Sequence, residues 1–198
     1  RTDQKTFYLD GAGNMGFGKE TVPLGLEDGG YQGQVEHFIW TTYLGPLMDQ
    51  VVYSYNRHRG RQLARKISSF LDRNPGASVN IIALSAGTGV AVFALESLPP
   101  KYQVDNVIML SSSLSADYDL SRALRRVRGG MYFFWSPNDP VLRGMVPLVG
   151  TVDRENTSQV AGVIGARVPP RAGRQTRQMY ATAVHNVRWY PHGGVGPI

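Results

Sequence analysis

The sequence contains no cysteine, which excludes disulfide bonds, thiolate metal sites and a cysteine nucleophile but leaves the redox compartment open. It also lacks a long apolar run, since no stretch approaches the ~18 residues of a membrane-spanning helix. The first five residues show no apolar core of a signal peptide, and the chain does not begin with methionine, as in a processed or trimmed segment. We expect a soluble protein without a transmembrane segment, with the cytoplasm favoured as its location.

Negative charge is the scarcer sign: 15 Asp and Glu stand against 21 Lys and Arg, which gives a net charge of +6. A basic surface attracts nucleic acid or anionic lipid. The cations are scattered, however, and the densest stretch, 167–177, lies in neither an aromatic-interleaved strand nor a basic amphipathic helix. We interpret the excess as solvated surface and expect no nucleic-acid partner. The sequence leaves the oligomeric state open.

Apolar, β-rich runs alternate with helical patterns along the chain, which predicts an α/β fold. We expect a single domain over residues 1–198, with a mostly parallel sheet of about six strands and helices on both faces. The expected strands are 6–9, 36–41, 78–84, 103–110, 130–135 and 186–190, and the expected helices are 56–72, 88–98 and 120–127, the last capped by Asp119. The stretch 141–177 is rich in Gly, Pro and Arg and suggests a lid or surface excursion.

The sharpest local feature is I-A-L-S-A-G-T-G, residues 82–89, in which a buried strand runs into Ser85 and a helix follows. Small residues stand two positions before and after the serine, at Ala83 and Gly87. This is the nucleophile-elbow pattern G-x-S-x-G with Ala in the first glycine position. The helix start would aim backbone N–H groups, that of Ala86 first, at a developing oxyanion. A serine capping a helix after a buried strand is the structural alternative.

A serine nucleophile needs a base and an acid, which follow it in the order Ser, Asp or Glu, His in one large class of hydrolases. Asp139 lies in the turn S-P-N-D-P after a later strand, although Asn-Asp-Pro also forms turns without catalysis. Of the four histidines, only His185 and His192 come later than Ser85. We favour His192 as the base because it follows the last expected strand, and keep His185 as the alternative.

A second glycine-rich loop, L-D-G-A-G-N-M-G, follows the first expected strand. Its glycines spell G-x-G-x-x-G, the fingerprint of a dinucleotide-binding turn, and Glu36 stands 20 residues beyond Gly16. That fingerprint must open a helix. We expect no helix through the glycines and proline of 18–30, and therefore interpret the loop as the second oxyanion donor, supplied by the N–H of Ala12 or its neighbour Gly11.

The loop L-D-G-A-G-N, the segment L-S-A-G-T-G, the run L-S-S-S-L-S with Y-D-L, and G-T-V-D-R together resemble a bacterial branch of the α/β-hydrolase superfamily. The resemblance spans most of the chain and implies a mostly parallel sheet and hydrolysis of ester, thioester or amide bonds through an acyl-enzyme. It implies Ser85 as nucleophile, Asp139 as acid and His192 as base. The departures are Ala83 in the elbow, a short C-terminal end and fewer strands than the superfamily's eight.

The sequence thus predicts a serine hydrolase acting on a small acyl substrate through backbone donors at Ala86 and Ala12 or Gly11. No His or carboxylate spacing supports a metal site, and we expect no cofactor. The first alternative is a non-catalytic binding protein with the same fold, and the second is a dinucleotide-binding protein.

Overall fold

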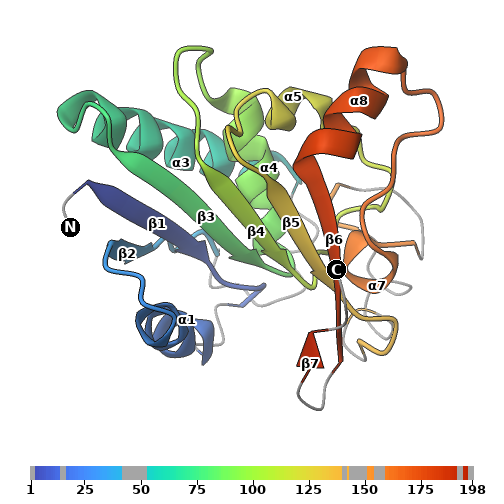
Figure 1. Ribbon diagram of the computed structural model, residues 1–198, viewed down its shortest axis with the longest axis horizontal. Coiled ribbons are helices and arrows are strands. Elements are labelled where there is room, and N and C mark those ends of the chain that lie inside the picture. Colours follow the sequence, from blue (N-terminus) through green and yellow to red (C-terminus); the bar gives the residue numbers. More distant parts are fainter. Residues whose placement is uncertain are drawn as a thin grey trace.

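The computed structural model describes residues 3–13, 17–41, 53–139, 142, 151–153, 159–190 and 194–195. These residues contain one seven-stranded sheet in the order β2-β1-β3-β4-β5-β6-β7 (Figure 1). Its strands are β1 (Gln4–Leu9), β2 (Gln34–His37), β3 (Ser78–Leu84), β4 (Asn106–Leu110), β5 (Met131–Trp135), β6 (Val184–Tyr190) and β7 (Gly194–Val195). The pairs from β2 to β6 are parallel, and β7 is antiparallel to β6. The expected α/β fold with a mostly parallel sheet is confirmed.

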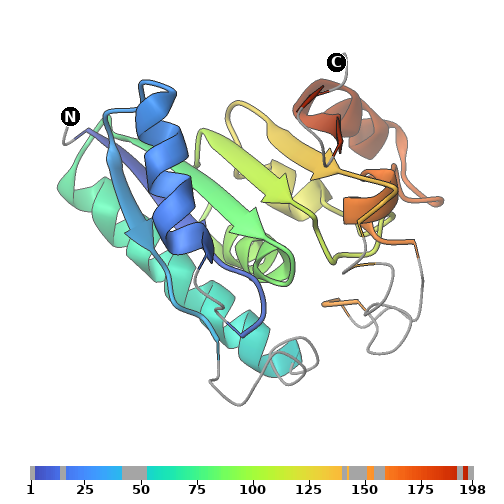
Figure 2. The ribbon, with the colours of Figure 1, turned by 90° about the horizontal axis from the view of Figure 1, so that it is seen from below.

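The helices lie on both sides of this sheet. They are α1 (Phe17–Asp28), α3 (Tyr53–Arg73), α4 (Gly87–Ser97), α5 (Ser121–Leu124), α7 (Ala161–Ile164) and α8 (Arg174–Ala183). Figure 2 shows α1 on one face, over β1 and β2, and α3 and α4 on the other. Because α4 contacts α5 and α5 contacts α8, these two helices extend the α3–α4 layer. No helix among the described residues is long and apolar enough to cross a membrane.

The core lies between the sheet and the α3–α4 layer. Val79, Ile81 and Ala83 alternate along β3 and are fully buried on this side, while nearly all of α4 is buried. Burying one such aliphatic side chain contributes about 1.5–3 kcal/mol. Helix α3 packs closely on α4 at Gly60, where a Cβ atom would lie 2.7 Å from the Cβ of Phe93. The helix that follows Ser85 is therefore held between the sheet and α3.

Several element boundaries differ from the sequence predictions. Strand β3 matches its prediction, whereas β4 begins later, at Asn106, and β6 begins earlier, at Val184. The segment expected as a strand over 36–41 forms β2 over Gln34–His37. The helix expected over 120–127 shortens to α5, whose N-cap position is Leu120. Asp119, the predicted N-cap, lies one residue before the observed cap position, and its carboxylate accepts a hydrogen bond from the Ser121 N–H at 2.9 Å.

The expectation that no helix follows the first glycine-rich loop is wrong. Helix α1 covers that segment and contains Pro23. The glycines of this segment have different structural roles, which the glycine content alone does not reveal. At Gly18 a Cβ atom would lie 1.7 Å from the hydroxyl of Tyr8, so this glycine permits close packing on β1. Gly30, with φ 82°, ends the helix in the left-handed conformation that C-terminal caps require.

The glycine-rich stretch 141–177 contains more regular structure than the sequence indicated. It includes α7 and the beginning of α8, neither of which was predicted. Much of the remainder lies outside the described residues, so the lid or surface excursion stays a prediction.

Candidate active site

The candidate residues gather where the parallel strands end. Ser85 directly follows β3, Asp10 and Gly11 follow β1, and Asp139 lies in the turn after β5. The carboxyl ends of parallel strands lie at one edge of a sheet. In open α/β sheets, ligands bind in the crevice at this edge between two neighbouring strands whose following connections run to opposite sides. Here β1 and β3 are neighbours, with β2 on the outer side of β1, so the loops after β1 and β3 flank that crevice. The structure brings Ser85, the first glycine-rich loop and Asp139 to this edge.

Ser85 occupies a strained turn between β3 and α4. Its φ of 51° lies in the left-handed region, which is costly for a residue with a side chain. Hydrogen bonds hold the turn in place: the Ser85 N–H donates to the Leu110 carbonyl at 2.9 Å, and the Ser85 carbonyl accepts from the Thr88 N–H at 3.1 Å and hydroxyl at 2.5 Å. Within the described part of the chain, the Ser85 hydroxyl itself makes no hydrogen bond, so it remains available to a substrate.

The residues on either side of this turn are small for steric reasons. Ala83 is completely buried in β3. A Cβ atom at Gly87 would lie 2.5 Å from the carbonyl oxygen of Asp10 and 3.0 Å from that of Leu9. The first turn of α4 therefore rests against the backbone at the end of β1, which sets the distance between Ser85 and the first glycine-rich loop.

The first glycine-rich loop is anchored by the buried carboxylate of Asp10. One carboxylate oxygen accepts hydrogen bonds from the Gly11 N–H at 2.8 Å and the Tyr8 hydroxyl at 3.0 Å. The indole of Trp40 donates to the Asp10 carbonyl at 2.8 Å. A Cβ atom at Gly11 would lie 3.5 Å from the Cβ of Ser85, so the loop lies directly beside the serine. The Gly11 N–H is already used, whereas the Ala12 N–H has no partner among the described residues.

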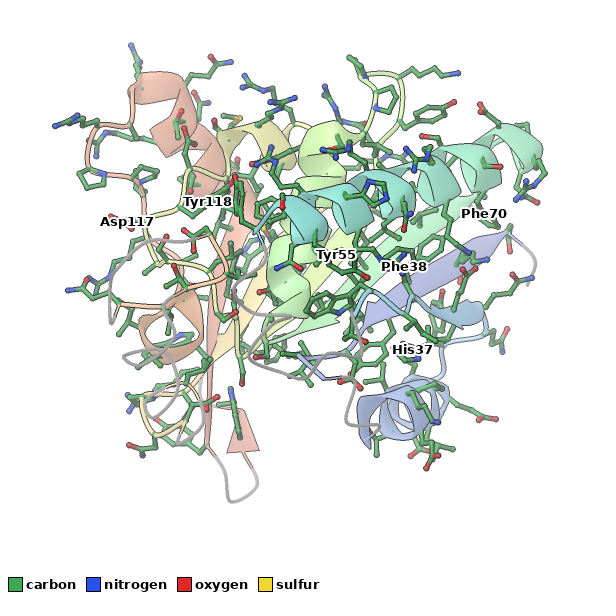
Figure 3. All side chains as sticks on the ribbon, turned by 180° about the vertical axis from the view of Figure 1, so that it is seen from behind. His37, Phe38, Tyr55, Phe70, Asp117 and Tyr118 are labelled. Carbon is green, nitrogen blue, oxygen red and sulfur yellow. The ribbon has the colours of Figure 1, made fainter. Side chains whose placement is uncertain are left out.

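The surroundings of Asp10 influence two further groups. Burial, followed by the charge and hydrogen bond of Asp10, raises the pKa of Tyr8 well above its ordinary value. Burial lowers the pKa of His37, with Lys19 adding to this effect and Asp10 opposing it. The two rings lie 5.5 Å apart, and the buried Nε2 of His37 has no hydrogen-bond partner among the described residues. Figure 3 shows His37, the last residue of β2, well separated from the labelled Tyr118.

Asp139 is held in a buried turn beyond β5. The residue is 7% exposed, and its carboxylate accepts a hydrogen bond from the Leu142 N–H at 3.0 Å. Its own N–H donates to the Ser136 carbonyl at 3.2 Å. The turn thus fixes the position of a carboxylate two strands away from Ser85.

Of the two candidate bases, His185 lies among the described residues and His192 does not. His185 lies inside β6, opposite Tyr132, and its ring stacks on that residue at 4.7 Å. Counting strand spacings from β3 to β6 and three residues along the strands places it roughly 17 Å from Ser85, so the structure does not bring His185 to the serine. His192 lies outside the described residues, directly beyond β6.

The helix after the first glycine-rich loop restores one requirement of the dinucleotide fingerprint. Glu36, the acidic residue of that fingerprint, is less suited to binding a ribose. Glu36 lies 2.5 Å from the ammonium of Lys5 and 2.6 Å from that of Lys66. Burial alone would raise the pKa of Glu36, but the two ammonium groups outweigh burial and hold it below its ordinary value. A carboxylate engaged in this way is not free to bind a ribose hydroxyl.

Sequence reasoning gave no role to Ser111, the residue directly after β4. It has the second positive φ of a non-glycine residue in the described part of the chain, 44°. A run of serines gives no sign of backbone conformation, so only the structure could identify this position. The described residues contain no group of three or more His, Asp or Glu placed to hold a metal ion.

Comparison with known proteins yields similarity in structure only. No family model matches the sequence, and no curated protein matches it. A crystal structure of a lipase/esterase from Lactobacillus plantarum superposes with a TM-score of 0.52 at 14% identity, covering 97% of this chain and 78% of that one. The phospholipase PlaB from Legionella pneumophila gives a TM-score of 0.40 at 13% identity, with 93% of this chain spanning 38% of the other. The first of these likenesses supports the fold.

Proposed function

We propose that the protein is a serine hydrolase of the esterase or acyl-hydrolase type, with Ser85 as nucleophile. The observation that carries the proposal is the strained turn at Ser85, placed between a glycine-rich loop and a buried carboxylate on one sheet edge. Such strain persists where surrounding structure enforces it, and it concentrates at functional sites.

The spacing of the strands supports a triad with Asp139 as acid. Ser85 and Asp139 follow β3 and β5, which are separated by β4, so their strands lie ~9.6 Å apart. A histidine ring accepting from the serine hydroxyl and donating to the carboxylate spans roughly 8 Å between the two oxygens. His192 follows β6, next to β5, and would supply this ring.

The reaction then proceeds through an acyl-enzyme. The Ser85 oxygen bonds to the carbonyl carbon of an ester while His192 takes the hydroxyl proton, and Asp139 orients the imidazole and stabilises its positive form. When the carbon–oxygen bond to the alcohol breaks, His192 returns the proton to the departing oxygen. Water repeats the sequence to release the acid. The chemistry needs no cofactor.

Two backbone donors would stabilise the oxyanion. One is the Ala86 N–H at the start of α4, where the helix dipole adds favourable charge. The other is the Ala12 N–H, because Asp10 occupies the Gly11 N–H. Removing one such donor typically costs about 100- to 1,000-fold in kcat.

Labelling with a fluorophosphonate probe tests the nucleophile. We expect the wild-type protein to be labelled, Ser85→Ala to be unlabelled, and the control Ser97→Ala to be labelled as wild type. Ser97 is a suitable control because it lies at the far end of α4, where its hydroxyl donates to the Phe93 carbonyl. Equal labelling of Ser85→Ala would refute the assignment. Absence of any labelling would favour a non-catalytic binding protein with this fold.

Two further measurements extend this test. A panel of p-nitrophenyl esters of increasing chain length would show which acyl groups the site accepts. A titration with NAD addresses the dinucleotide alternative, and we expect no change in the thermal unfolding midpoint, since bound ligand would raise it.

A further inference from the structure

Ser111 lies beside Ser85 on the carboxyl edge and shares its unusual backbone. Leu84 pairs with Leu110, so the residues that follow them, Ser85 and Ser111, occupy neighbouring strand ends ~4.8 Å apart. The Ser111 N–H donates to the Phe134 carbonyl at 3.1 Å, which continues the ladder one residue past β4. Two non-glycine residues with positive φ thus stand side by side at the proposed site.

The turn at Ser111 is held from two directions. At Gly162 a Cβ atom would lie 2.6 Å from both the carbonyl carbon of Ser111 and the nitrogen of Ser112, so α7 packs tightly on this backbone. The Gly162 N–H donates to the Ser112 carbonyl at 2.8 Å, and the hydroxyls of Ser112 and Thr88 lie 2.9 Å apart. The strained conformation is therefore enforced by α7 and α4 together.

Packing gives no reason for a serine side chain at this position. Ser111 is partly exposed, and its hydroxyl makes no hydrogen bond within the described residues. Glycine would adopt this φ without strain. A strained residue with an unused hydroxyl beside a nucleophile points to contact with the substrate.

The order of loops along the edge indicates which part of the substrate this hydroxyl would meet. The glycine-rich loop after β1 lies on one side of Ser85, so the carbonyl oxygen of a bound ester points toward β1. Asp139 lies on the opposite side, after β5, and the base must stand between it and Ser85. The leaving-group oxygen, which receives a proton from that base, is therefore on the β4 side, above Ser111.

We propose that Ser111 contacts the leaving group and donates a hydrogen bond to its departing oxygen. This inference rests on the proposed serine hydrolase function and extends it to a substrate class: esters of ordinary alkyl alcohols, whose oxygen needs support as it leaves. A p-nitrophenolate leaving group is stable without such support, so its esters should be insensitive to Ser111.

The experiment compares two esters with the same acyl group, one with a primary alkyl alcohol and one with p-nitrophenol. In Ser111→Ala and Ser111→Gly, kcat/KM for the alkyl ester should fall about tenfold, as expected for one hydrogen bond, while the p-nitrophenyl ester changes less than about twofold. Fluorophosphonate labelling should keep its wild-type rate, and Ser97→Ala should behave as wild type with both esters. Ser111→Gly should unfold at a higher temperature than Ser111→Ala, because glycine relieves the strain.

The possible outcomes separate the two proposals. A wild-type protein that is not labelled refutes the hydrolase function, and with it the role of Ser111. A labelled wild type with equal losses on both esters, or with no loss on either, refutes the leaving-group contact alone. A lower unfolding midpoint for Ser111→Gly than for Ser111→Ala refutes the strain on which the inference depends.

Discussion

Replacing Gly87 by alanine tests the packing that sets the site, independently of any catalytic role. The new Cβ atom would lie 2.5 Å from the carbonyl oxygen of Asp10 and 3.0 Å from that of Leu9. It would also lie 3.2 Å from the Cβ of Leu9. The two closest contacts are backbone atoms, which cannot rotate away. Overpacking costs about 1–3 kcal/mol, and the better helix propensity of alanine offsets up to ~1 kcal/mol. We expect a net loss of about 1–2 kcal/mol in the free energy of unfolding.

Urea and thermal denaturation measure this loss. For a chain of 198 residues, it corresponds to a fall of about 2–8 °C in the unfolding midpoint. Gly25→Ala is the matched control, because Gly25 also lies in a helix and a Cβ atom there would have nothing within 4 Å. The control should be neutral or stabilised by up to ~1 kcal/mol. A Gly87→Ala protein as stable as this control would refute the close approach of α4 to β1.

Substitutions at three further residues test the site and its electrostatics. Asp10→Ala removes the acceptor shared by Tyr8 and the Gly11 N–H, so in steady-state assays kcat should fall at least ~10-fold with KM unchanged, while Asp10→Asn should retain most activity. Asp139→Asn should lower kcat by about 10³- to 10⁴-fold, and near-normal turnover would show that another acid serves the base. Because burial depresses the pKa of His37, the unfolded chain takes up a proton below about pH 6.5 that the folded chain does not. Stability should therefore decline from pH 7.5 to 5, and by less in His37→Gln, as followed by urea unfolding; an identical decline would contradict this assignment.

The parts of the fold that the sequence predicted well are those in which a local pattern and burial agree. Strand β3 is nearly continuous in apolar residues and runs over its predicted range. Helix α1 was missed because glycine and Pro23 disfavour an isolated helix, whereas here close packing on Tyr8 and a left-handed cap explain Gly18 and Gly30. The packing of Gly18 on Tyr8 cannot be recognised without the neighbouring strand.

The candidate site likewise contains residues that the sequence predicts and features that only the structure reveals. Ser85 and Asp139 could be proposed from turn patterns that follow apolar strands, and strand order alone then places them on one edge. The use of the Gly11 N–H by the adjacent Asp10 is a side-chain orientation that the residue types alone do not fix. The strain at Ser111 is enforced by contacts between segments far apart in the chain. Such contacts leave no periodic signal in a single sequence.

The anchoring of Asp10 links the site to an edge of the sheet. Its carbonyl is held by Trp40, which follows β2, a four-residue strand at the sheet's edge. Short edge strands open locally far more often than the whole domain unfolds. Each such opening would release the indole and loosen the loop beside Ser85. Hydrogen exchange at β2 therefore sets an upper limit on the fraction of time that the loop keeps its working geometry.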